Sequence, residues 1–312
     1  MTLFLLVLFF LKGSCVTPLS PSVRAVITYR VNDGMPHWEL ARDIDDDEVA
    51  EGGLVSAEAV DIGNGRSKNL TLETAGFELF AETVTSLSTS DFYDSETVAT
   101  RYYPEVASAL KAKLKCSHVH VFSHSVRNRD RVGEGDIQGY GLSAHVDVAP
   151  SAAAEIFAGM VRRAEQNYPE KNLRRGRCLL VNAWRNIDHL EPVRSMPLAL
   201  LDSSTVVAPD DFVTFNLETD QYRVVQYRLG NFHKKRHRWY YFPKMTSDEL
   251  LVFKQWDSDV MRPVRTCFHT AFDNGEKVLR QSIEVRALCF FPDHEPDTCP
   301  DVEQIYQDLL AS

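Results

Sequence analysis

Three places in the sequence carry a histidine and a carboxylate separated by one residue, a spacing that suits a metal site on a β-strand. They are His37-Trp38-Glu39, His145-Val146-Asp147 and His189-Leu190-Glu191. Alternate side chains of an extended chain point to the same face, so both members of such a pair can reach one ion. Two histidines and one carboxylate occupy one face of an octahedral iron(II) and leave three positions open. The spacing alone does not choose among the three pairs.

The positions of the pairs favour His145 and Asp147. His37 precedes a predicted helical region, and the third pair lies in the polar stretch 185–192, which is typical of a loop. His145 and Asp147 lie in residues 139–150, where polar and apolar residues alternate up to a proline. The alternative is a partly exposed strand whose polar face carries a histidine and an aspartate without binding a metal.

His269 is the candidate for the second histidine ligand. It is followed by a turn at residues 273–275 and then by a strand that carries Arg280, Ser282 and Arg286. A guanidinium can pair in bidentate fashion with the distal carboxylate of 2-oxoglutarate, and a hydroxyl adds a further donor. We therefore predict that these three residues bind the ketoacid, and which of the two arginines does so stays open. The alternative for either arginine is a surface ion pair.

The periodicity of the chain predicts a mostly β protein with flanking helices. Residues 104–115 and 151–167 have helical periodicity, and a third helix is expected at 247–253. Strands are expected at residues 24–31, 118–124, 178–184, 212–215, 222–228, 238–242 and 282–291. Helices followed by a series of strands fit a double-sheet jelly roll, formed here as one domain over residues 21–312.

The composition limits the classes of function. The chain has 312 residues, of which 44% are hydrophobic and 25% charged, which is typical of a globular protein. A net charge of −10 argues against a nucleic-acid partner, because phosphate binding needs clustered cations. One basic run, residues 233–238, is expected to be a solvated loop, with contact to an anionic ligand or surface as the alternative.

The N-terminus and the cysteines bear on localisation. Residues 3–11 are all apolar, too few to span a bilayer and without a positive segment before them. Residues 1–20 are therefore a secretory signal, a membrane anchor or the product of a misplaced start codon, and membrane contact is expected only through residues 3–11. Six scattered cysteines indicate buried thiols. We expect a cytoplasmic protein, with a secreted or membrane-associated one as the alternative.

Several longer motifs follow one another in order. They are Asn182-Ala-Trp-Arg185, Pro197-Leu-Ala-Leu-Leu-Asp202, His237-Arg-Trp-Tyr-Tyr-Phe-Pro243, Asp248-Glu-Leu-Leu-Val-Phe-Lys254, Phe268-His-Thr-Ala-Phe-Asp273 and Arg280-Gln-Ser-Ile-Glu-Val-Arg-Ala-Leu288. From about residue 23 to about residue 292, the sequence resembles the hydroxylase/desaturase family of fungal and bacterial secondary metabolism. That family includes the gibberellin desaturase and a component of the cephamycin methoxylation system. The chain departs from it at Asn186-Ile187, where Pro-Leu is common.

The resemblance implies a double-stranded β-helix, the cupin-like jelly roll, and an enzyme that uses Fe(II), 2-oxoglutarate and dioxygen. It implies His145, Asp147 and His269 as the iron ligands, and hydroxylation or desaturation of a small secondary metabolite. Asp147 argues against halogenation, because a halide needs the coordination site that the carboxylate fills. Two alternatives are a methyltransferase partner and a non-catalytic small-molecule-binding protein of the same fold. The first lacks support, since no G-x-G-x-x-G motif is present. The substrate and the oligomeric state stay open.

Overall fold

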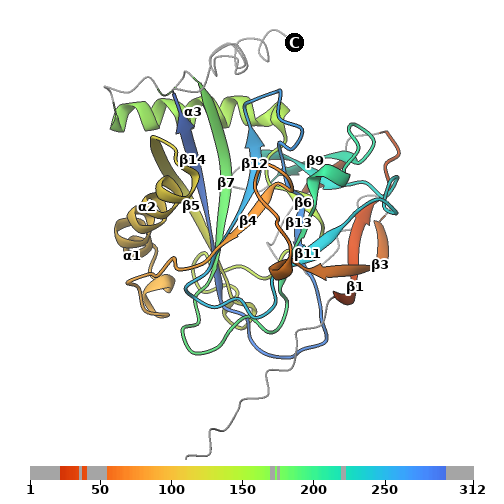
Figure 1. Cartoon of the computed structure of the whole chain (residues 1–312), viewed down its shortest axis with the longest axis horizontal. Helices are drawn as coiled ribbons and strands as arrows, with labels where there is room; N and C mark the ends of the chain where they lie inside the picture. The colour runs from red at the N-terminus through yellow and green to blue at the C-terminus, as the bar shows by residue number, and fades with distance from the viewer. Residues whose placement is uncertain are drawn as a thin grey trace, which may run out of the picture.

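Two β-sheets packed against each other form most of the protein. The computed structural model describes residues 22–34, 37–40, 55–168, 173, 176–218 and 223–292. One sheet has nine strands in the order β1-β3-β11-β8-β13-β6-β10-β9-β2, and the other has five in the order β4-β12-β7-β14-β5. Figure 1 shows the five-stranded sheet beside the helices α1 and α2, with the nine-stranded sheet on its other side. The predicted jelly roll with flanking helices is confirmed.

The nine-stranded sheet curls until it nearly closes on itself. Isolated bridges join Thr28 of β1 to Ser143, and Arg30 of β1 to Gly230, so the first strand returns to the segments beside β6 and β10. Its strands are β1 (Ser22–Arg30), β2 (His37–Leu40), β3 (Val55–Asn64), β6 (His145–Val146), β8 (Leu198–Leu201), β9 (Phe212–Glu218), β10 (Arg223–Leu229), β11 (Trp239–Tyr241) and β13 (His269–Ala271). The strand expected over residues 139–150 is therefore shorter than predicted, because only β6 within it is paired.

The five-stranded sheet is antiparallel throughout and carries helices on one face. Its strands are β4 (Phe77–Phe80), β5 (His118–Arg127), β7 (Arg177–Asn186), β12 (Leu250–Asp257) and β14 (Ser282–Phe291). Side chains of β7 alternate between its two faces. Val181 and Ala183 pack with Val106 and Leu110 of the helical layer, whereas Trp184 packs with Leu200 of the other sheet. The second face of this sheet is therefore the floor of the space between the sheets.

The helices lie outside the two sheets. They are η1 (Gly65–Ser67), η2 (Asp91–Tyr93), α1 (Ser95–Thr97), the π-helical η3 (Val98–Tyr102), α2 (Tyr103–Leu114), η4 (Arg129–Arg131), α3 (Pro150–Asn167) and η5 (Ser203–Thr205). The helices predicted at 104–115 and 151–167 are confirmed as α2 and α3. Figure 1 shows α3 lying across the ends of β14 and β7, where Val161 and Ala164 pack with Leu180 and Phe290.

The helix predicted at residues 247–253 is wrong, because this segment enters β12. Leu250 and Val252 pack toward the helical layer, whereas Leu251 and Phe253 pack between the sheets. That two-residue alternation buries both faces, which a short helix cannot do. The residues read as a helix N-cap form a turn instead, in which the backbone N–H of Thr246 donates to the Glu249 carboxylate at 3.0 Å.

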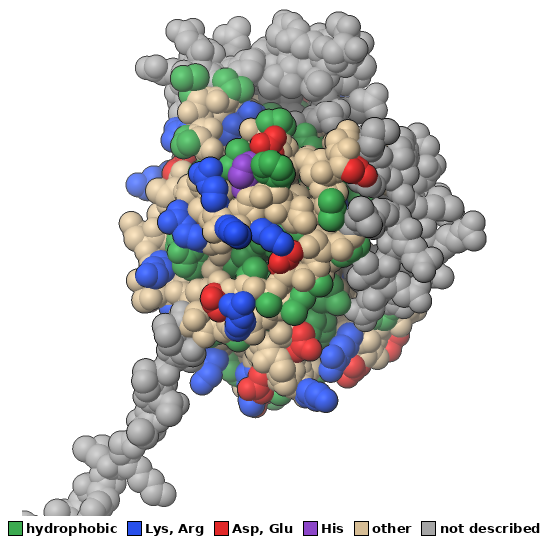
Figure 2. All heavy atoms as spheres, turned by 90° about the vertical axis from the view of Figure 1, so that its right-hand side faces the viewer, with side chains coloured by type: hydrophobic (Ala, Val, Ile, Leu, Met, Phe, Trp, Pro, Cys, Tyr) green, Lys and Arg blue, Asp and Glu red, His purple; other side chains and the backbone are tan. Residues whose placement is uncertain are grey.

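The basic run at residues 233–238 forms turns before β11, as expected of a loop, but its histidines face inward. His233 Nδ1 and His237 Nε2 lie 3.2 and 3.1 Å from the two oxygens of the buried Asp211. Figure 2 shows one face of the molecule, on which basic and acidic side chains are mixed.

Four of the predicted buried thiols are confirmed. Cys116, Cys178, Cys267 and Cys289 are free and buried, and the remaining two cysteines lie outside the described residues. Residues 1–20 and the acidic segment 43–51 also lie outside them. Among the helices of the described part, none has the length and apolar character needed to cross a bilayer.

A buried charge cluster fixes the end of β12. Asp257 accepts from Arg177 Nη2 at 2.6 Å and from Lys254 Nζ at 2.8 Å, and the Asp257 and Lys254 side chains are fully buried. Removing one member of such a cluster leaves the others as buried charges without compensation.

We therefore expect Asp257→Ala to lower the free energy of unfolding by about 3–5 kcal/mol. Urea denaturation of the full chain measures this change. Asp61→Ala is the matched control, because its partner Arg24 is exposed and such pairs contribute at most about 1 kcal/mol. Equal effects of the two substitutions would contradict a structural role for the cluster.

Candidate active site

The three predicted metal ligands come together between the sheets. His145 in β6 is the direct antiparallel partner of His269, which begins β13. Asp147 follows β6. One ligand atom from each residue lies within 4.8 Å of the other two. The three side chains are 3–12% exposed, so the site is shielded from solvent.

The distances between ligand atoms fit a single octahedral metal. Asp147 Oδ1 lies 3.2 Å from His145 Nε2 and 3.6 Å from His269 Nε2. Atoms about 2.1 Å from a metal at adjacent corners of an octahedron are about 3 Å apart. The three residues can thus hold an ion with little rearrangement, and the two-histidine, one-carboxylate set suits iron(II).

Both histidines are oriented by backbone carbonyls. Nδ1 of His145 lies 2.7 Å from the carbonyl oxygen of Ser143, and Nδ1 of His269 lies 3.3 Å from that of Cys267. A neutral imidazole that donates from Nδ1 keeps its lone pair on Nε2 for a metal. This geometry therefore directs both Nε2 atoms toward Asp147.

The two carboxylate oxygens of Asp147 have different partners. Oδ2 accepts from Asn182 Nδ2 at 2.9 Å and from Arg286 Nε at 2.8 Å, whereas Oδ1 faces the histidines. The backbone N–H of Asp147 donates to Gln255 Oε1 at 2.8 Å. These contacts fix both the position and the rotation of the carboxylate, and they leave one oxygen available to an ion.

The electrostatics keep Asp147 and His269 in the forms that bind a cation. Burial alone would raise the pKa of Asp147, but the Arg286 guanidinium and the two histidines hold it well below its ordinary range. Burial, with His145 nearby, lowers the pKa of His269 to about 3. An ionised Asp147 and a neutral His269 are therefore the stable forms at neutral pH.

The two predicted ketoacid-binding arginines occupy different places. Arg286 lies on the Asp147 carboxylate and also donates from Nη2 to Glu284 at 3.0 Å. Arg280 lies apart from Asp147, with its guanidinium carbon 4.0 Å above the Tyr140 ring and 5.7 Å from that of Trp184. Burial lowers the pKa of Arg280 to about 9, as expected for a buried cation that has no ion pair with a described carboxylate.

Several buried polar side-chain atoms lack a hydrogen-bond partner within the described part of the chain. Among them are Asn182 Oδ1 and Gln255 Nε2, whose residues contact Asp147, and Arg280 Nε and Ser282 Oγ at the start of β14. Such atoms are costly in a protein interior, so they are candidates for contact with a polar ligand. The set includes donors suited to a carboxylate and an acceptor suited to a hydroxyl or water.

Asn182 and Gln255 contact Asp147 but were not predicted to do so. Asn182 could have been found from the sequence, because it is a polar residue at an inward position of the buried strand β7. Gln255 lies where the register of β12 shifts between residues 254 and 256. That irregularity breaks the alternation on which such a prediction depends.

The other two histidine–carboxylate pairs lie elsewhere. His189 and Glu191 are in an exposed turn after β7, as predicted for a loop. His37 lies in β2, which pairs with β9, and the side chains of β2 are outside the described set.

Comparisons with known proteins agree with this geometry. A protein-family model described as an oxidoreductase/YMDC permease-like domain matches residues 29–290. The alpha-ketoglutarate-dependent dioxygenase phiK of Fungal sp. (strain ATCC 74256) is 31% identical over 261 residues, which cover 80% of this chain and 90% of phiK. The chain belongs to this family of Fe(II)- and 2-oxoglutarate-dependent dioxygenases. Its cofactor is therefore Fe(II), and its co-substrates are 2-oxoglutarate and dioxygen.

Further similarities support the same assignment of this dioxygenase. The hydroxylase/desaturase efuI of Hormonema carpetanum is 28% identical over 294 residues, which cover 80% of this chain and 93% of efuI. The solved structure of the iron and alpha-ketoglutarate-dependent endoperoxidase NvfI superposes with a TM-score of 0.71 at 22% identity. That match covers 87% of this chain and 98% of NvfI and confirms the fold. The predicted enzyme is supported, and its two non-catalytic alternatives are not.

The buried His269 should make the stability of the metal-free protein depend on pH. Its pKa is about 3 when folded and about 6.5 when unfolded, so the unfolded state binds more protons between these values. The contribution of the neutral His269 to the free energy of unfolding is therefore complete above about pH 6.5, and it is lost as the pH falls toward 3.

We expect His269→Gln to make the free energy of unfolding less dependent on pH between about pH 4.5 and 6.5, by up to about 1.4 kcal/mol per pH unit. Urea denaturation of the metal-free protein at several pH values measures the slope. His189→Gln, which removes an exposed histidine, should leave the slope unchanged. If His269→Gln has the same dependence of unfolding free energy on pH as the parent protein, the pKa of His269 is not lowered in the folded state.

Proposed function

We propose that His145, Asp147 and His269 hold the iron, and that Arg280 and Ser282 bind the distal carboxylate of 2-oxoglutarate. The bound iron supplies the dioxygen chemistry that oxidises a C–H bond while 2-oxoglutarate becomes succinate and carbon dioxide. We further propose that the substrate is a small secondary metabolite, which is hydroxylated or desaturated. The observation that carries the proposal is the pair of unpartnered buried donors, Arg280 Nε and Ser282 Oγ, together with the three gathered ligands.

Arg280 is suited to a carboxylate because its position is fixed and its charge is not neutralised. The backbone of Arg280 is held by Tyr140, whose hydroxyl donates to the Arg280 carbonyl at 2.7 Å, and its Nη1 donates to the Met196 carbonyl. These contacts set the orientation of the guanidinium without supplying an anion. A bidentate carboxylate would satisfy the remaining donors and offset the cost of burying the cation.

Ser282 lies two residues further along, at the start of β14, and is fully buried. Arg280 lies just before β14, and an extended backbone there would place the side chains at 280 and 282 on the same side. The Ser282 hydroxyl can therefore donate to the same carboxylate as Arg280.

Arg286 is suited to a positioning role. Its Nε donates to Asp147 Oδ2, its Nη2 donates to Glu284, and its Nη1 lies 3.3 Å from Ser125 Oγ. With Asn182 on the same oxygen, Arg286 keeps Asp147 ionised and turned so that Oδ1 faces the histidines. Of the two arginines predicted to bind the ketoacid, we therefore assign that role to Arg280.

We also propose that the enzyme works in the cytoplasm. Four described cysteines are free thiols, and free thiols are typical of reducing compartments. Residues 3–11 are the basis of the secreted or membrane-associated alternative. Fractionation of cells that produce the full chain, compared with the chain lacking residues 1–20, tests this point, and a membrane-bound or secreted full chain would contradict it.

The assignment of roles is tested by anaerobic titration of the purified protein with Fe(II) and 2-oxoglutarate, following the weak visible charge-transfer band of the chelate. We expect His145→Ala to abolish the band. Arg280→Gln should retain iron but need about a hundredfold more 2-oxoglutarate, because a charge-assisted bidentate pair is lost. Arg286→Gln should chiefly weaken iron binding, because Asp147 loses a donor.

Arg24→Gln is the control, because Arg24 is exposed and forms its ion pair with Asp61 rather than with a residue of the site. The reverse pattern, with Arg286→Gln impairing 2-oxoglutarate and Arg280→Gln impairing iron, would contradict the assignment. Absence of a band in the parent protein, with iron shown by elemental analysis to be unbound, would contradict the proposed metal ligands.

A further inference from the structure

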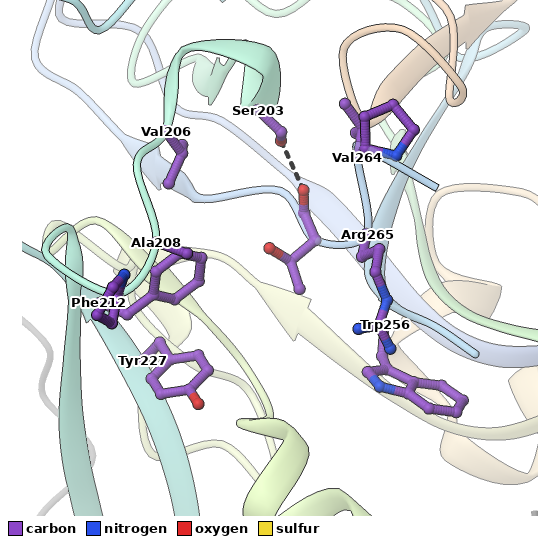
Figure 3. A pocket seen from close by; sticks show the side chains of 11 residues that line it. Ser203, Val206, Ala208, Phe212, Tyr227, Trp256, Val264 and Arg265 are labelled. Atoms are coloured by element: carbon purple, nitrogen blue, oxygen red, sulfur yellow. Dashed lines mark hydrogen bonds between the residues drawn. The ribbon is translucent and has the colours of Figure 1, made fainter. Parts of the chain in front are cut away.

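A pocket of about 340 Å³ lies at the rim of the nine-stranded sheet. Its walls come from three segments: residues 203–209 after β8, the neighbouring strands β9 and β10, and residues 256–266, which include the end of β12 and most of the loop that leads to β13. Figure 3 shows Phe212 and Tyr227 on one side and Trp256 and Arg265 on the other. The pocket is therefore bounded by elements from both sheets.

The walls are mostly apolar and aromatic. Phe212 and Tyr227 pack edge to face with ring centroids 5.0 Å apart, and Val206 packs with them. Trp256 forms the opposite wall. Ser203, one of the few polar groups, already donates to the carbonyl of Thr266. Such a surface favours an apolar ligand of drug-like size.

Arg265 is the only charged side chain among the residues that line the pocket, all of which belong to the described part of the chain. Its Nε donates to the Asp257 carbonyl at 2.9 Å, which fixes the guanidinium, and its two amino groups have no hydrogen-bond partner among the described residues. The nearby carboxylates are engaged elsewhere, Asp257 with Arg177 and Asp259 with Arg262. Arg265 thus presents two free donors and a positive charge beside an apolar wall.

The pocket adjoins the residues that support the metal centre. Trp256 follows Gln255, which accepts from the Asp147 backbone, and Tyr227 is the direct cross-strand partner of Val146. Phe212 lies 5.2 Å, ring to ring, from Phe268, the residue before His269. Because Val146 and Phe268 alternate with His145 and His269, the wall formed by Phe212 and Tyr227 lies on the face of the nine-stranded sheet opposite the ligands. The pocket is therefore a site separate from the metal centre.

We infer that this pocket is a second ligand site, which binds an apolar carboxylic acid with its carboxylate on the Arg265 amino groups and its apolar body between Trp256 and Tyr227. This inference does not rest on the proposed function, because none of the three iron ligands lines the pocket. Buried guanidinium groups pair with carboxylates in bidentate fashion, and aromatic walls accept a ring or chain without competing for the charge.

Two probes of equal shape test the inference: 2-naphthoate and its neutral analogue 2-naphthylmethanol, both followed by calorimetry with the full chain. We expect 2-naphthoate to bind at least about tenfold more tightly, because only it forms a charge-assisted pair. Arg265→Gln should remove this preference and leave binding of the alcohol unchanged. Arg265→Lys should restore part of it, since the charge remains and the planar fork is lost.

Two further variants show where the probes bind. Ala208→Phe fills the pocket and should weaken both probes alike. Arg262→Gln is the matched control, because this neighbouring arginine is paired with Asp259 and Glu73 and does not line the pocket. Arg262→Gln should leave both affinities unchanged. Equal affinity for acid and alcohol in the parent, or an effect of Arg262→Gln equal to that of Arg265→Gln, would overturn the inference.

Two controls separate this inference from the proposed function. The charge-transfer band of iron and 2-oxoglutarate should be the same in Arg265→Gln as in the parent. If the parent shows no band while 2-naphthoate still binds through Arg265, the proposed metal site fails and the pocket stands. 2-Naphthoate should also leave the affinity of the parent for 2-oxoglutarate, measured by the same band, unchanged. Competition between 2-naphthoate and 2-oxoglutarate would place the acid at the iron and overturn the inference of a separate site.

Discussion

The arrangement of the centre depends on how the carboxylate of Asp147 is held. One oxygen accepts from Arg286 and Asn182, and the other faces two imidazole nitrogens. Without the guanidinium, a carboxyl group this deeply buried would favour its neutral form, and a neutral acid is a poor ligand for a cation. The partly buried Arg286 guanidinium therefore favours the charged form of the ligand and, with Asn182, sets its direction. The histidines need no such help, because the backbone carbonyls of Ser143 and Cys267 are sufficient to orient them.

The packing of two sheets brings these groups together from distant parts of the chain. β6 and β13 of the nine-stranded sheet supply the ligands, whereas β7 and β14 of the five-stranded sheet supply Asn182 and Arg286. The distance between the sheets therefore determines whether Asp147 reaches its partners. Apolar contacts such as that of Phe253 with His269, whose ring centroids are 4.6 Å apart, hold this distance. The core and the site are thus built from alternate residues of the same strands.

Much of this could be predicted from the sequence, because strand periodicity and the spacing of two histidines and an aspartate are local signals. The positions of α2, α3, β7 and β14 followed from their periodicity. The distinction between Arg280 and Arg286 did not, because the sequence suggests one continuous strand, whereas β14 begins at Ser282 and only Arg286 lies on it. Gln255 was hidden by the register shift in β12. The segment 247–253 was misread because Thr246 and Glu249 resemble a helix cap, whereas burial on both faces decided in favour of a strand.

The segment 256–268, which includes the end of β12 and the loop that leads to β13, begins next to Gln255 and ends directly before His269, so residues of the metal centre lie at both of its ends. Between them, the side chains of Trp256, Val264 and Arg265 face the pocket. Substitutions within the loop alter the shape and charge of the pocket while its two strands keep their register. Relatives of this enzyme can therefore differ in the molecules that the pocket accepts while they keep the same oxidative chemistry.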